Sequence, residues 1–489
     1  MVDGVLAPIH LTKVLDGLAQ NPALPGGLVR RLTHYRRGFG HVALRPDLTL
    51  EVIEEILASG HRWLPHSLAL NRQLPHAVRM RLAAHADPGI RAALVVGARD
   101  ASRELCERLI DDPDTRVRAE LAERDDVPAD LLARLARDPD PEVRATLGRW
   151  WTQAPEAIRR VLLADPVDRV RAAACSTYYA RLPHPVPPPD LVAGLLHDPA
   201  TRAGAVRHAA LTPQLASRLA GDPDHQVRRQ VAEHPQRPGQ LRDLLAEDPS
   251  ARVRVGVFGR RDTPESVRHR ISTDIQQRDR PLTALPDGDH DHDALLQQLE
   301  DHMAVVELRH LRVGWVTADP LPYVSSPYIC FRRSAARSRS LPADAVRRLL
   351  NDDDSGVCTT MATHAPHLVD PVTAERIDRE FRPDKKTNWR PADAFMFPPQ
   401  TLRRLAADAD PRMRCLAPRD PDLPAELAER LGADPDSAVR RAVAGHPNLP
   451  AHARSTLLAD PSEEVAHAAA TAATLPVADM DRLLILAGV

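Results

Sequence analysis

This chain of 489 residues is poor in aromatic residues and in lysine, and these shortages limit the classes of protein to which it can belong. Aromatic residues make up only 3% of the sequence, so alanine, leucine and valine must fill the core, which suits thin layers of helices. Lysine occurs only at Lys13, Lys385 and Lys386, and we attribute the dominance of arginine to GC-rich coding. The 65 basic and 67 acidic residues leave a net charge of −2. This balance gives no reason to expect a general attraction to nucleic acid or to anionic membranes.

Cysteine is also scarce, and no two cysteines form a C-x-x-C pair. Five isolated thiols indicate a reducing compartment. The first residues lack the basic start and apolar core of a signal peptide, and no run approaches the ~18 apolar residues of a membrane helix. We therefore expect a cytoplasmic protein without a membrane span, a metal site or a cofactor. The cysteines are Cys106, Cys175, Cys330, Cys358 and Cys415.

An internal repeat runs through most of the sequence. Its pattern is close to D-P-D-x-x-V-R-x-x-V-A, followed by a proline-containing turn and then x-x-L-x-x-L-L. Neighbouring copies mostly start 24 to 27 residues apart, and the insertion LPHPVPPPD lengthens one interval to 33. One unit near residue 300 is too degenerate to place. The clear copies start at Asp112, Asp138, Asp165, Asp198, Asp222, Asp248, Asp408, Asp434 and Asp460.

Each position of the repeat has a local reason. Asp138 can cap a short helix, and Pro139 would then occupy the first helical position, where no N–H is needed. Val143 and Leu147 lie one turn apart on one face of that helix. A second helix, with Leu131 as an example, carries an apolar stripe. Two such helices cannot bury their faces alone, so the repeat predicts an all-α fold in which successive pairs stack as an α-solenoid.

The tandem D-P-x-x-x-V-R and L-P-x-x-L-x-x-L-L motifs resemble the leucine-rich repeat variant family, a relative of HEAT and armadillo repeats. The resemblance covers most of the chain and is weakest at residues 275–325. It implies a right-handed superhelix of short helices. Some members carry an N-terminal iron–sulfur segment, but this chain has no cysteine before Cys106, so that feature is not expected here.

Two stretches interrupt the repeat. Residues 281–293 (PLTALPDGDHDHD) read as a linker rich in proline and aspartate, and residues 381–400 read as a longer irregular connection. We therefore expect an N-terminal repeat block at residues 1–280 and a C-terminal block at residues 294–489. The aspartates and histidines at the end of the linker are metal ligands by type, but they form a short string without EF-hand spacing, so we interpret them as solvated.

The repeated aspartate and arginine lie six residues apart, as in Asp138 with Arg144 and Asp434 with Arg440. Such arginines could form a row for phosphates. Because each arginine has an aspartate and the chain is nearly neutral, we favour charge-assisted hydrogen bonds at helix starts and between repeats. A histidine also recurs where the first helix ends, as at His446, and we expect it to satisfy terminal carbonyls and not to act in catalysis.

Two clusters stand out as candidate sites. Trp150 and Trp151 end one short helix, and Tyr178 and Tyr179 fall at nearly the same place in the next unit. These four aromatics could anchor a protein partner or pack beneath the proline-rich insertion. The densest basic run follows Tyr323 and Tyr328, and it is a weaker candidate for nucleic acid. That basic patch consists of Arg332, Arg333, Arg337 and Arg339.

No P-loop, GxGxxG, GxSxG or HExxH motif occurs, and no nucleophile or carboxylate pair stands apart from the repeat. We therefore expect a non-catalytic scaffold that binds a protein partner along the solenoid. Two alternatives stay open: a nucleic-acid-binding protein shaped like the HEAT-like alkylpurine DNA glycosylases, and an enzyme or enzyme-accessory protein resembling the HEAT-like bilin lyases. Unpaired arginines lining a groove would favour the first, and a deep pocket with an unexpected polar residue would favour the second.

Overall fold

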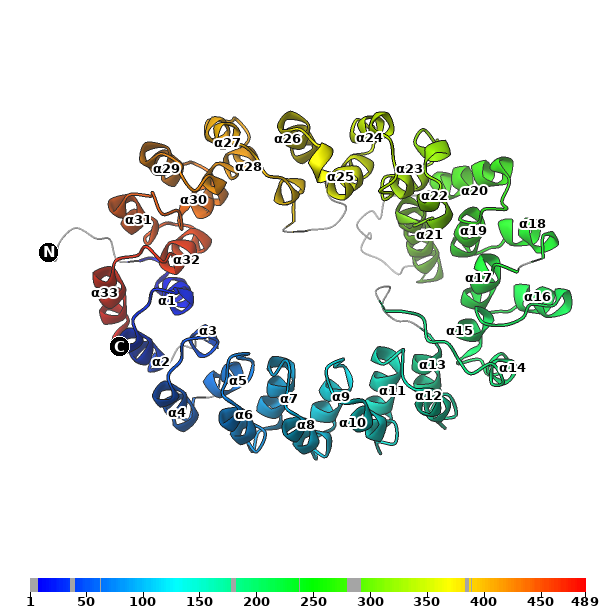
Figure 1. The fold of residues 1–489 in the computed structure, drawn as a ribbon, viewed down its shortest axis with the longest axis horizontal. Helices are drawn as coiled ribbons and strands as arrows, with labels where there is room; N and C mark the ends of the chain where they lie inside the picture. The colour runs from blue at the N-terminus through cyan, green and yellow to red at the C-terminus, as the bar shows by residue number, and fades with distance from the viewer. Residues whose placement is uncertain are drawn as a thin grey trace. The chain divides into compact units, whose positions relative to one another are not determined.

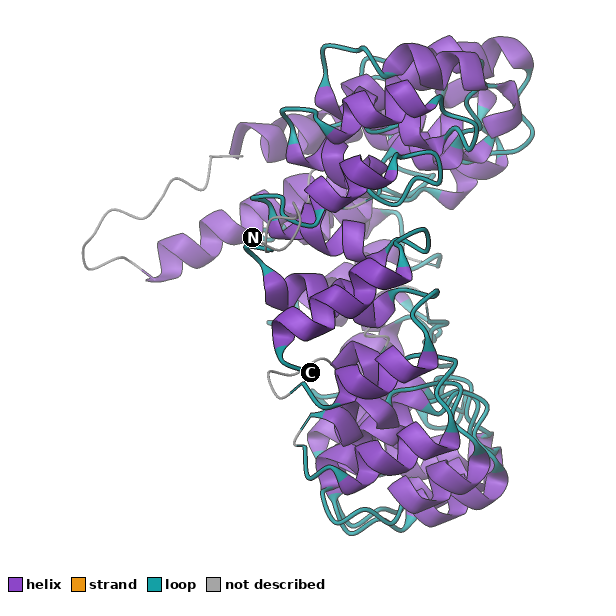
Figure 2. Ribbon diagram, turned by 90° about the vertical axis from the view of Figure 1, so that its left-hand side faces the viewer, coloured by secondary structure: helices purple, strands orange, loops and turns teal. Residues whose placement is uncertain are grey.

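The computed structural model describes residues 8–489 except 36–39, 62, 177–181, 237, 279–291, 383–386 and 388. In this part of the chain every regular element is a helix and none is a strand (Figure 2), so the predicted all-α fold is confirmed. None of the described helices is both long enough and apolar enough to cross a membrane. The chain forms two compact units: unit 1 comprises residues 1–135 and 396–489, and unit 2 comprises residues 136–395.

Unit 1 is built from both ends of the chain. Its helices are α1 (Leu11–Gln20), α2 (Gly26–Thr33), α3 (Gly40–Ala43), α4 (Leu50–Ala58), α5 (Leu64–Ala69), α6 (His76–Leu82), α7 (Pro88–Gly97), α8 (Arg103–Ile110), α9 (Thr115–Ala122), α10 (Ala129–Leu135), α27 (Pro399–Leu405), α28 (Pro411–Arg414), η4 (Ala417–Arg419), α29 (Ala425–Gly432), α30 (Ser437–Val443), α31 (Ala451–Leu457), α32 (Glu463–Thr471) and α33 (Val477–Ala487).

Unit 2 is continuous in sequence. Its helices are α11 (Pro141–Trp150), α12 (Glu156–Leu163), α13 (Asp168–Cys175), α14 (Val192–Leu195), α15 (Arg202–Val206), α16 (Pro213–Ala220), α17 (His225–Glu233), α18 (Gln240–Ala246), α19 (Ala251–Phe258), α20 (Glu265–Arg278), α21 (His292–His310), α22 (Gly314–Ala318), η1 (Leu321–Tyr323), α23 (Ile329–Ala335), α24 (Ala343–Leu350), α25 (Ser355–His364), η2 (Pro366–Leu368), α26 (Pro371–Glu380) and η3 (Pro391–Ala394).

Within each unit the helices alternate between two rows (Figure 1). In unit 1, α5 stacks on α7 and α7 on α9, while α8 stacks on α10. In unit 2, α17 stacks on α19 in one row and α16 on α18 in the other. The predicted core positions are buried: Val143 and Leu147 have no exposed surface, and Leu131 is nearly inaccessible. This stacking of short helix pairs is that of an α-solenoid, as the repeat predicts.

The helix caps differ from the prediction by two residues. Helix α11 begins at Pro141, and the side chain of Asp140 accepts a hydrogen bond from the backbone N–H of Glu142 (2.8 Å). Asp138 does not cap the helix; its carboxylate accepts from the backbone N–H of Asp140 (2.9 Å) in the turn before it. Pro139 therefore lies in that turn. The first aspartate of D-P-D shapes the turn and the second caps the helix.

The first and last described helices pack together within unit 1, with α32 beside α1 and α33 beside α2 (Figure 1). The Nδ2 of Asn21 donates to the carbonyls of Ala470 (2.9 Å) and Ala472 (2.7 Å). Asn71 makes the same pair of bonds, of 2.9 and 2.8 Å, to two carbonyls of the repeat that precedes it. Residues at the two ends of the chain are therefore joined by the contact that joins successive repeats.

The division into blocks at residues 1–280 and 294–489 stays a prediction. The linker predicted at residues 281–293 falls outside the described residues, apart from its last two, where α21 begins. Helix α21 occupies the place of the degenerate unit near residue 300. It has 19 residues, more than twice the length of its neighbours α19 and α23, and it stacks between them.

Candidate functional site

The repeated arginines form a ladder between neighbouring repeats. In a typical rung, Arg144 donates from Nε and Nη2 to the carboxylate of Asp165 in the next repeat (2.6 and 3.1 Å), and from Nη1 to the carbonyl of Asp138 (2.6 Å). The carboxylate partner thus belongs to the next repeat and not to the arginine's own. The structural interpretation is confirmed for these pairs: Arg91–Asp112, Arg144–Asp165, Arg171–Asp198, Arg202–Asp222, Arg228–Asp248, Arg254–Asp274, Arg332–Asp352, Arg414–Asp434 and Arg440–Asp460.

The recurring histidine also joins repeats. The Nε2 of His446 lies 2.9 Å from the carbonyl of Asp420, at the end of a helix in the preceding repeat, and its Nδ1 accepts from the backbone N–H of Asn448 (3.2 Å). His446 is 5% exposed, so it is a satisfied core histidine. The predicted structural role is confirmed, with a carbonyl of the neighbouring repeat as the partner.

Helix α21 interrupts the ladder in unit 2. It carries no D-P-D-x-x-V-R motif and is held by two carboxylates instead. Glu300 accepts a hydrogen bond from the hydroxyl of Ser250 (2.7 Å). Glu307 forms ion pairs with Arg229 of α17 and with Arg252 of α19, the latter at 3.1 Å. These contacts fix one side of α21 against α17 and α19.

Next to these contacts, α21 borders a pocket with a volume of about 950 Å³, which we name the Arg333 pocket and which Arg252 and Glu307 also line. Its lining combines several guanidiniums and histidines with apolar side chains and one carboxylate. Four arginines therefore face one glutamate, and that glutamate is already paired with Arg252. The lining residues are Arg252, His302, Met303, Val305, Val306, Glu307, Arg309, His310, Arg333, Ser355, Gly356, Phe381 and Arg382.

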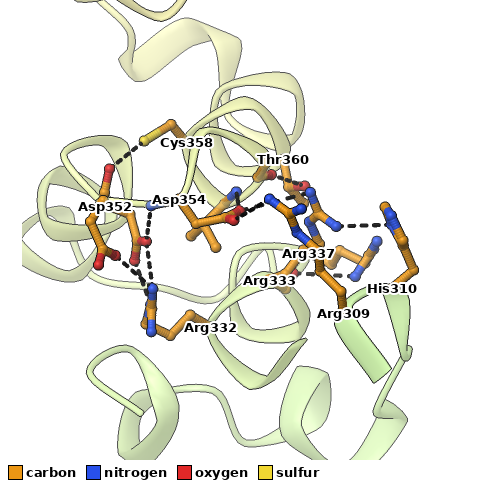
Figure 3. A network of polar contacts seen from close by, with 12 residues as sticks. Arg309, His310, Arg332, Arg333, Arg337, Asp352, Asp354, Cys358 and Thr360 are labelled. Carbon is orange, nitrogen blue, oxygen red and sulfur yellow. Dashed lines mark hydrogen bonds and ion pairs between the residues drawn. The ribbon is translucent and has the colours of Figure 1, made fainter. Parts of the chain in front are cut away.

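Two of these arginines share a single carboxylate, that of Asp354 (Figure 3). Arg309 Nη2 lies 3.1 Å from Asp354 Oδ2, and Arg333 Nη2 lies 3.8 Å from Oδ1. Asp354 also caps α25 by accepting from the backbone N–H of Val357 (3.0 Å). Arg333 Nη1 donates to Nδ1 of His310 (2.9 Å), because a guanidinium has no acceptor. The carboxylate of Asp354 is therefore approached by two guanidiniums, of which that of Arg333 is mostly buried and that of Arg309 is 43% exposed.

Arg337 adds a further positive charge behind the pocket. Its Nη1 donates to the carbonyl of Arg333 (3.3 Å), one turn earlier in the chain. Burial lowers the pKa of Arg337, and the nearby charges of Arg312 and Arg333 act in the same direction. Burial is the larger cause of the lowered pKa, and the two neighbouring guanidiniums add to it.

Gly356 makes room for the central arginine. A Cβ built at this position would overlap the guanidinium of Arg333. Any other residue at the start of α25 would therefore displace the Arg333 side chain from the pocket. A glycine inside a helix is unusual and can be noticed in the sequence. The reason for it cannot, because it is a contact with Arg333, which lies more than 20 residues away in another helix.

The structure divides the basic patch predicted from the sequence. Arg333 lines the pocket and Arg337 contacts it only through the carbonyl of Arg333, whereas Arg332 is a ladder residue that pairs with Asp352 at 2.7 Å. Arg339 is exposed and is not among the lining residues. Arg309, Arg382 and Gly356 also line the pocket but could not be predicted from the basic run, because they come from other segments. The neighbouring Tyr323 and Tyr328 both contact Phe331, with ring centroids 5.6 and 5.5 Å apart, and so belong to an aromatic cluster.

The aromatic hot spot stays a prediction. Trp150 ends α11 and Trp151 follows it, and both side chains are half-buried. Tyr178 and Tyr179 lie outside the described residues, as do Asp287, Asp289, His290 and Asp291 of the linker. Among the residues that the structure does describe, no group of three or more histidine, cysteine or acidic side chains could hold a metal ion.

Comparison with known proteins supports the repeat assignment. The family described as leucine rich repeat variant matches residues 438–462, so the resemblance is confirmed for that part of the chain. No curated protein matches the chain. Kap121p bound to RanGTP is 14% identical over 82% of this chain and 47% of its own, with a TM-score of 0.24. Kap121p bound to the extreme C-terminus of the phosphatase Cdc14p is 14% identical over 95% and 55%, with a TM-score of 0.22. The chain spans about half the length of these karyopherin chains.

Proposed function

We propose that this chain is a non-catalytic scaffold that binds a partner protein, and that the Arg333 pocket receives an acidic segment of that partner. The observation that carries the proposal is the surplus of guanidinium groups in a pocket of about 950 Å³. Arg333 lies 3.8 Å from the carboxylate of Asp354, which Arg309 also approaches, whereas a ladder arginine such as Arg144 lies 2.6 Å from its aspartate. A planar guanidinium with free donors binds a carboxylate with two parallel hydrogen bonds.

A binding role suits this chemistry better than a catalytic one. Arginine stays protonated throughout the physiological pH range, so it positions an anion and does not exchange protons with it. The apolar part of the lining, which includes Met303, Val306 and Phe381, offers contacts to the carbon atoms of a peptide. A carboxylate-bearing segment with apolar neighbours would satisfy both parts of the pocket.

A protein segment also suits the pocket better than nucleic acid does. Binding to a nucleic-acid backbone needs cations spaced along a track of phosphates. The ladder arginines, which could have formed such a track, are engaged with aspartates, and the net charge of the chain is −2. The surplus charge is confined to one pocket, which matches a short acidic segment.

The proposal can be tested with a fluorescein-labelled peptide of alternating glycine and glutamate, titrated with the protein at physiological salt and followed by fluorescence anisotropy. We expect Arg333→Gln to weaken binding about tenfold or more, because a charge-assisted hydrogen bond contributes ~1.5–3 kcal/mol. Arg339→Gln is the matched control, since Arg339 belongs to the same basic run but lies outside the pocket. Equal losses in the two variants, or tighter binding of a short duplex DNA than of the peptide, would overturn the proposal.

A further inference from the structure

Helix α21 exposes a row of large apolar side chains. Leu296, Leu299 and Met303 are 49%, 45% and 46% exposed. Their spacing of three and four residues places them on one face of the helix. Val306 follows at the same spacing and lines the Arg333 pocket, as Met303 does. We name Leu296, Leu299 and Met303 the α21 stripe.

The stripe is far more exposed than the residues through which α21 packs. Helix α21 packs through other residues, of which Ala304 is fully buried and Leu308 is 7% exposed. Glu300 and Glu307 fasten it to neighbouring helices. The regular repeat turns its large apolar side chains inward, so a row of half-exposed ones on a single helix is a candidate for contact with a partner.

The stripe and the pocket form one continuous surface of mixed chemistry. From Leu296 to Val306 a helix rises about 15 Å, since each residue adds ~1.5 Å. The apolar end of this surface is the stripe, and the basic end contains Arg309 and Arg333. A partner helix of a few turns has the right length to cover both, with apolar side chains at one-turn intervals and carboxylates toward one end.

We propose that the partner segment binds as an acidic amphipathic helix, with its apolar face on the α21 stripe and its carboxylates in the Arg333 pocket. This inference rests on the proposed function, because it names the form of the segment that the pocket receives. Charge complementarity selects this occupant: a purely apolar helix would leave the guanidiniums of Arg309 and Arg333 without an added anion, and an acidic coil would leave the stripe uncovered.

The test uses two labelled peptides of identical composition, titrated with the full chain. One places leucines at helical one-turn spacing with glutamates toward one end, and the other scrambles that order. We expect the amphipathic peptide to bind about tenfold or more tightly than its scramble. Leu299→Asp should remove this advantage. Leu244→Asp is the matched control, because Leu244 is also a half-exposed leucine of unit 2 (58% exposed) but lies on α18.

The outcomes separate this inference from the proposed function. If the scramble binds as well as the ordered peptide, or if Leu299→Asp has no more effect than Leu244→Asp, the amphipathic helix is wrong, while loss of binding in Arg333→Gln still supports an acidic ligand. If Arg333→Gln leaves the glycine–glutamate peptide bound, the proposed function itself fails. Self-association of the chain that Leu299→Asp abolishes would assign the stripe to a second copy and overturn the inference. Circular dichroism of each variant confirms that it is folded.

Discussion

Replacing Asn21 by alanine should loosen the contact between the two ends of the chain. Asn21 is fully buried, and its side chain makes three hydrogen bonds: two donated to Ala470 and Ala472 and one accepted from the N–H of Ala23 (2.8 Å). Asn71 makes an equivalent set, including one accepted from the N–H of Gln73 (2.8 Å). The first residue joins repeats that are 449 or more residues apart, and the second joins sequence neighbours.

The size of the effect follows from the bonds lost across the contact. Each of the two donated bonds contributes ~0.5–1.5 kcal/mol net, so Asn21→Ala should cost about 1–3 kcal/mol. That cost corresponds to an opening equilibrium raised by about 5- to 150-fold. The bond that Asn21 accepts from Ala23 is local, and Asn71 accepts an equivalent bond from Gln73. The cost of losing it therefore cancels when Asn21→Ala is compared with Asn71→Ala.

Amide hydrogen exchange measured peptide by peptide is the suitable assay, because long repeat arrays open locally and need not unfold in one step. In Asn21→Ala, exchange should accelerate in α1 and α32 and stay unchanged in α5. In Asn71→Ala, it should accelerate in α3 and α5 and stay unchanged in α32. If Asn21→Ala leaves α1 and α32 as protected as before while Asn71→Ala has the expected effect, the two ends do not pack together in solution.

Three further outcomes test the ladder and the core. Arg228→Ala leaves the buried carboxylate of Asp248 without its partner and should cost about 3 kcal/mol in urea unfolding, whereas Arg116→Ala, at a side chain 72% exposed, should leave the urea midpoint nearly unchanged. The hydrogen bond from a ladder arginine lowers the pKa of Asp198 below 3.8. The stabilisation from this ion pair is therefore present above pH 3.8 and is lost as the pH falls through the folded-state pKa. Asp198→Asn should reduce the fall of the urea midpoint in this acidic range. Burial raises the pKa of Cys330 to about 12, so iodoacetamide should alkylate it only after unfolding.

Much of the fold could be predicted from the sequence because the repeat is local. The positions of Val143 and Leu147 on one helix face depend only on residues within two turns, and the structure buries both. The paired aspartate and arginine indicated a ladder, although not that Arg144 reaches the next repeat's Asp165. The cap was misplaced because both aspartates of D-P-D are good caps by composition, and only the turn geometry shows that Asp140 is used.

The site could be predicted only in part, because its residues come from segments that the sequence does not connect. Arg333 was recognised from its dense basic run. Arg309 and Arg382 stand in degenerate or irregular stretches, where no repeat position predicts their neighbours. The need for glycine at position 356 becomes clear only from its contact with the guanidinium of Arg333. The packing of α1 on α32 likewise depends on a contact over more than 440 residues, and no local pattern could indicate it.

The place of the pocket follows from how a regular repeat uses its charges. Arg440 donates to both carboxylate oxygens of Asp460 and to the carbonyl of Asp434, so a ladder arginine keeps few donors for a partner. An arginine can bind an external anion only where this pairing is broken. The degenerate unit interrupts this pairing at α21. There Arg309 approaches the carboxylate of Asp354, the N-cap of α25, and Arg333 approaches the same carboxylate. The same unit lengthens α21 and so supplies the exposed stripe. One departure from the repeat therefore creates both features on which binding is proposed to depend, and a regular repeat substituted there should remove both together.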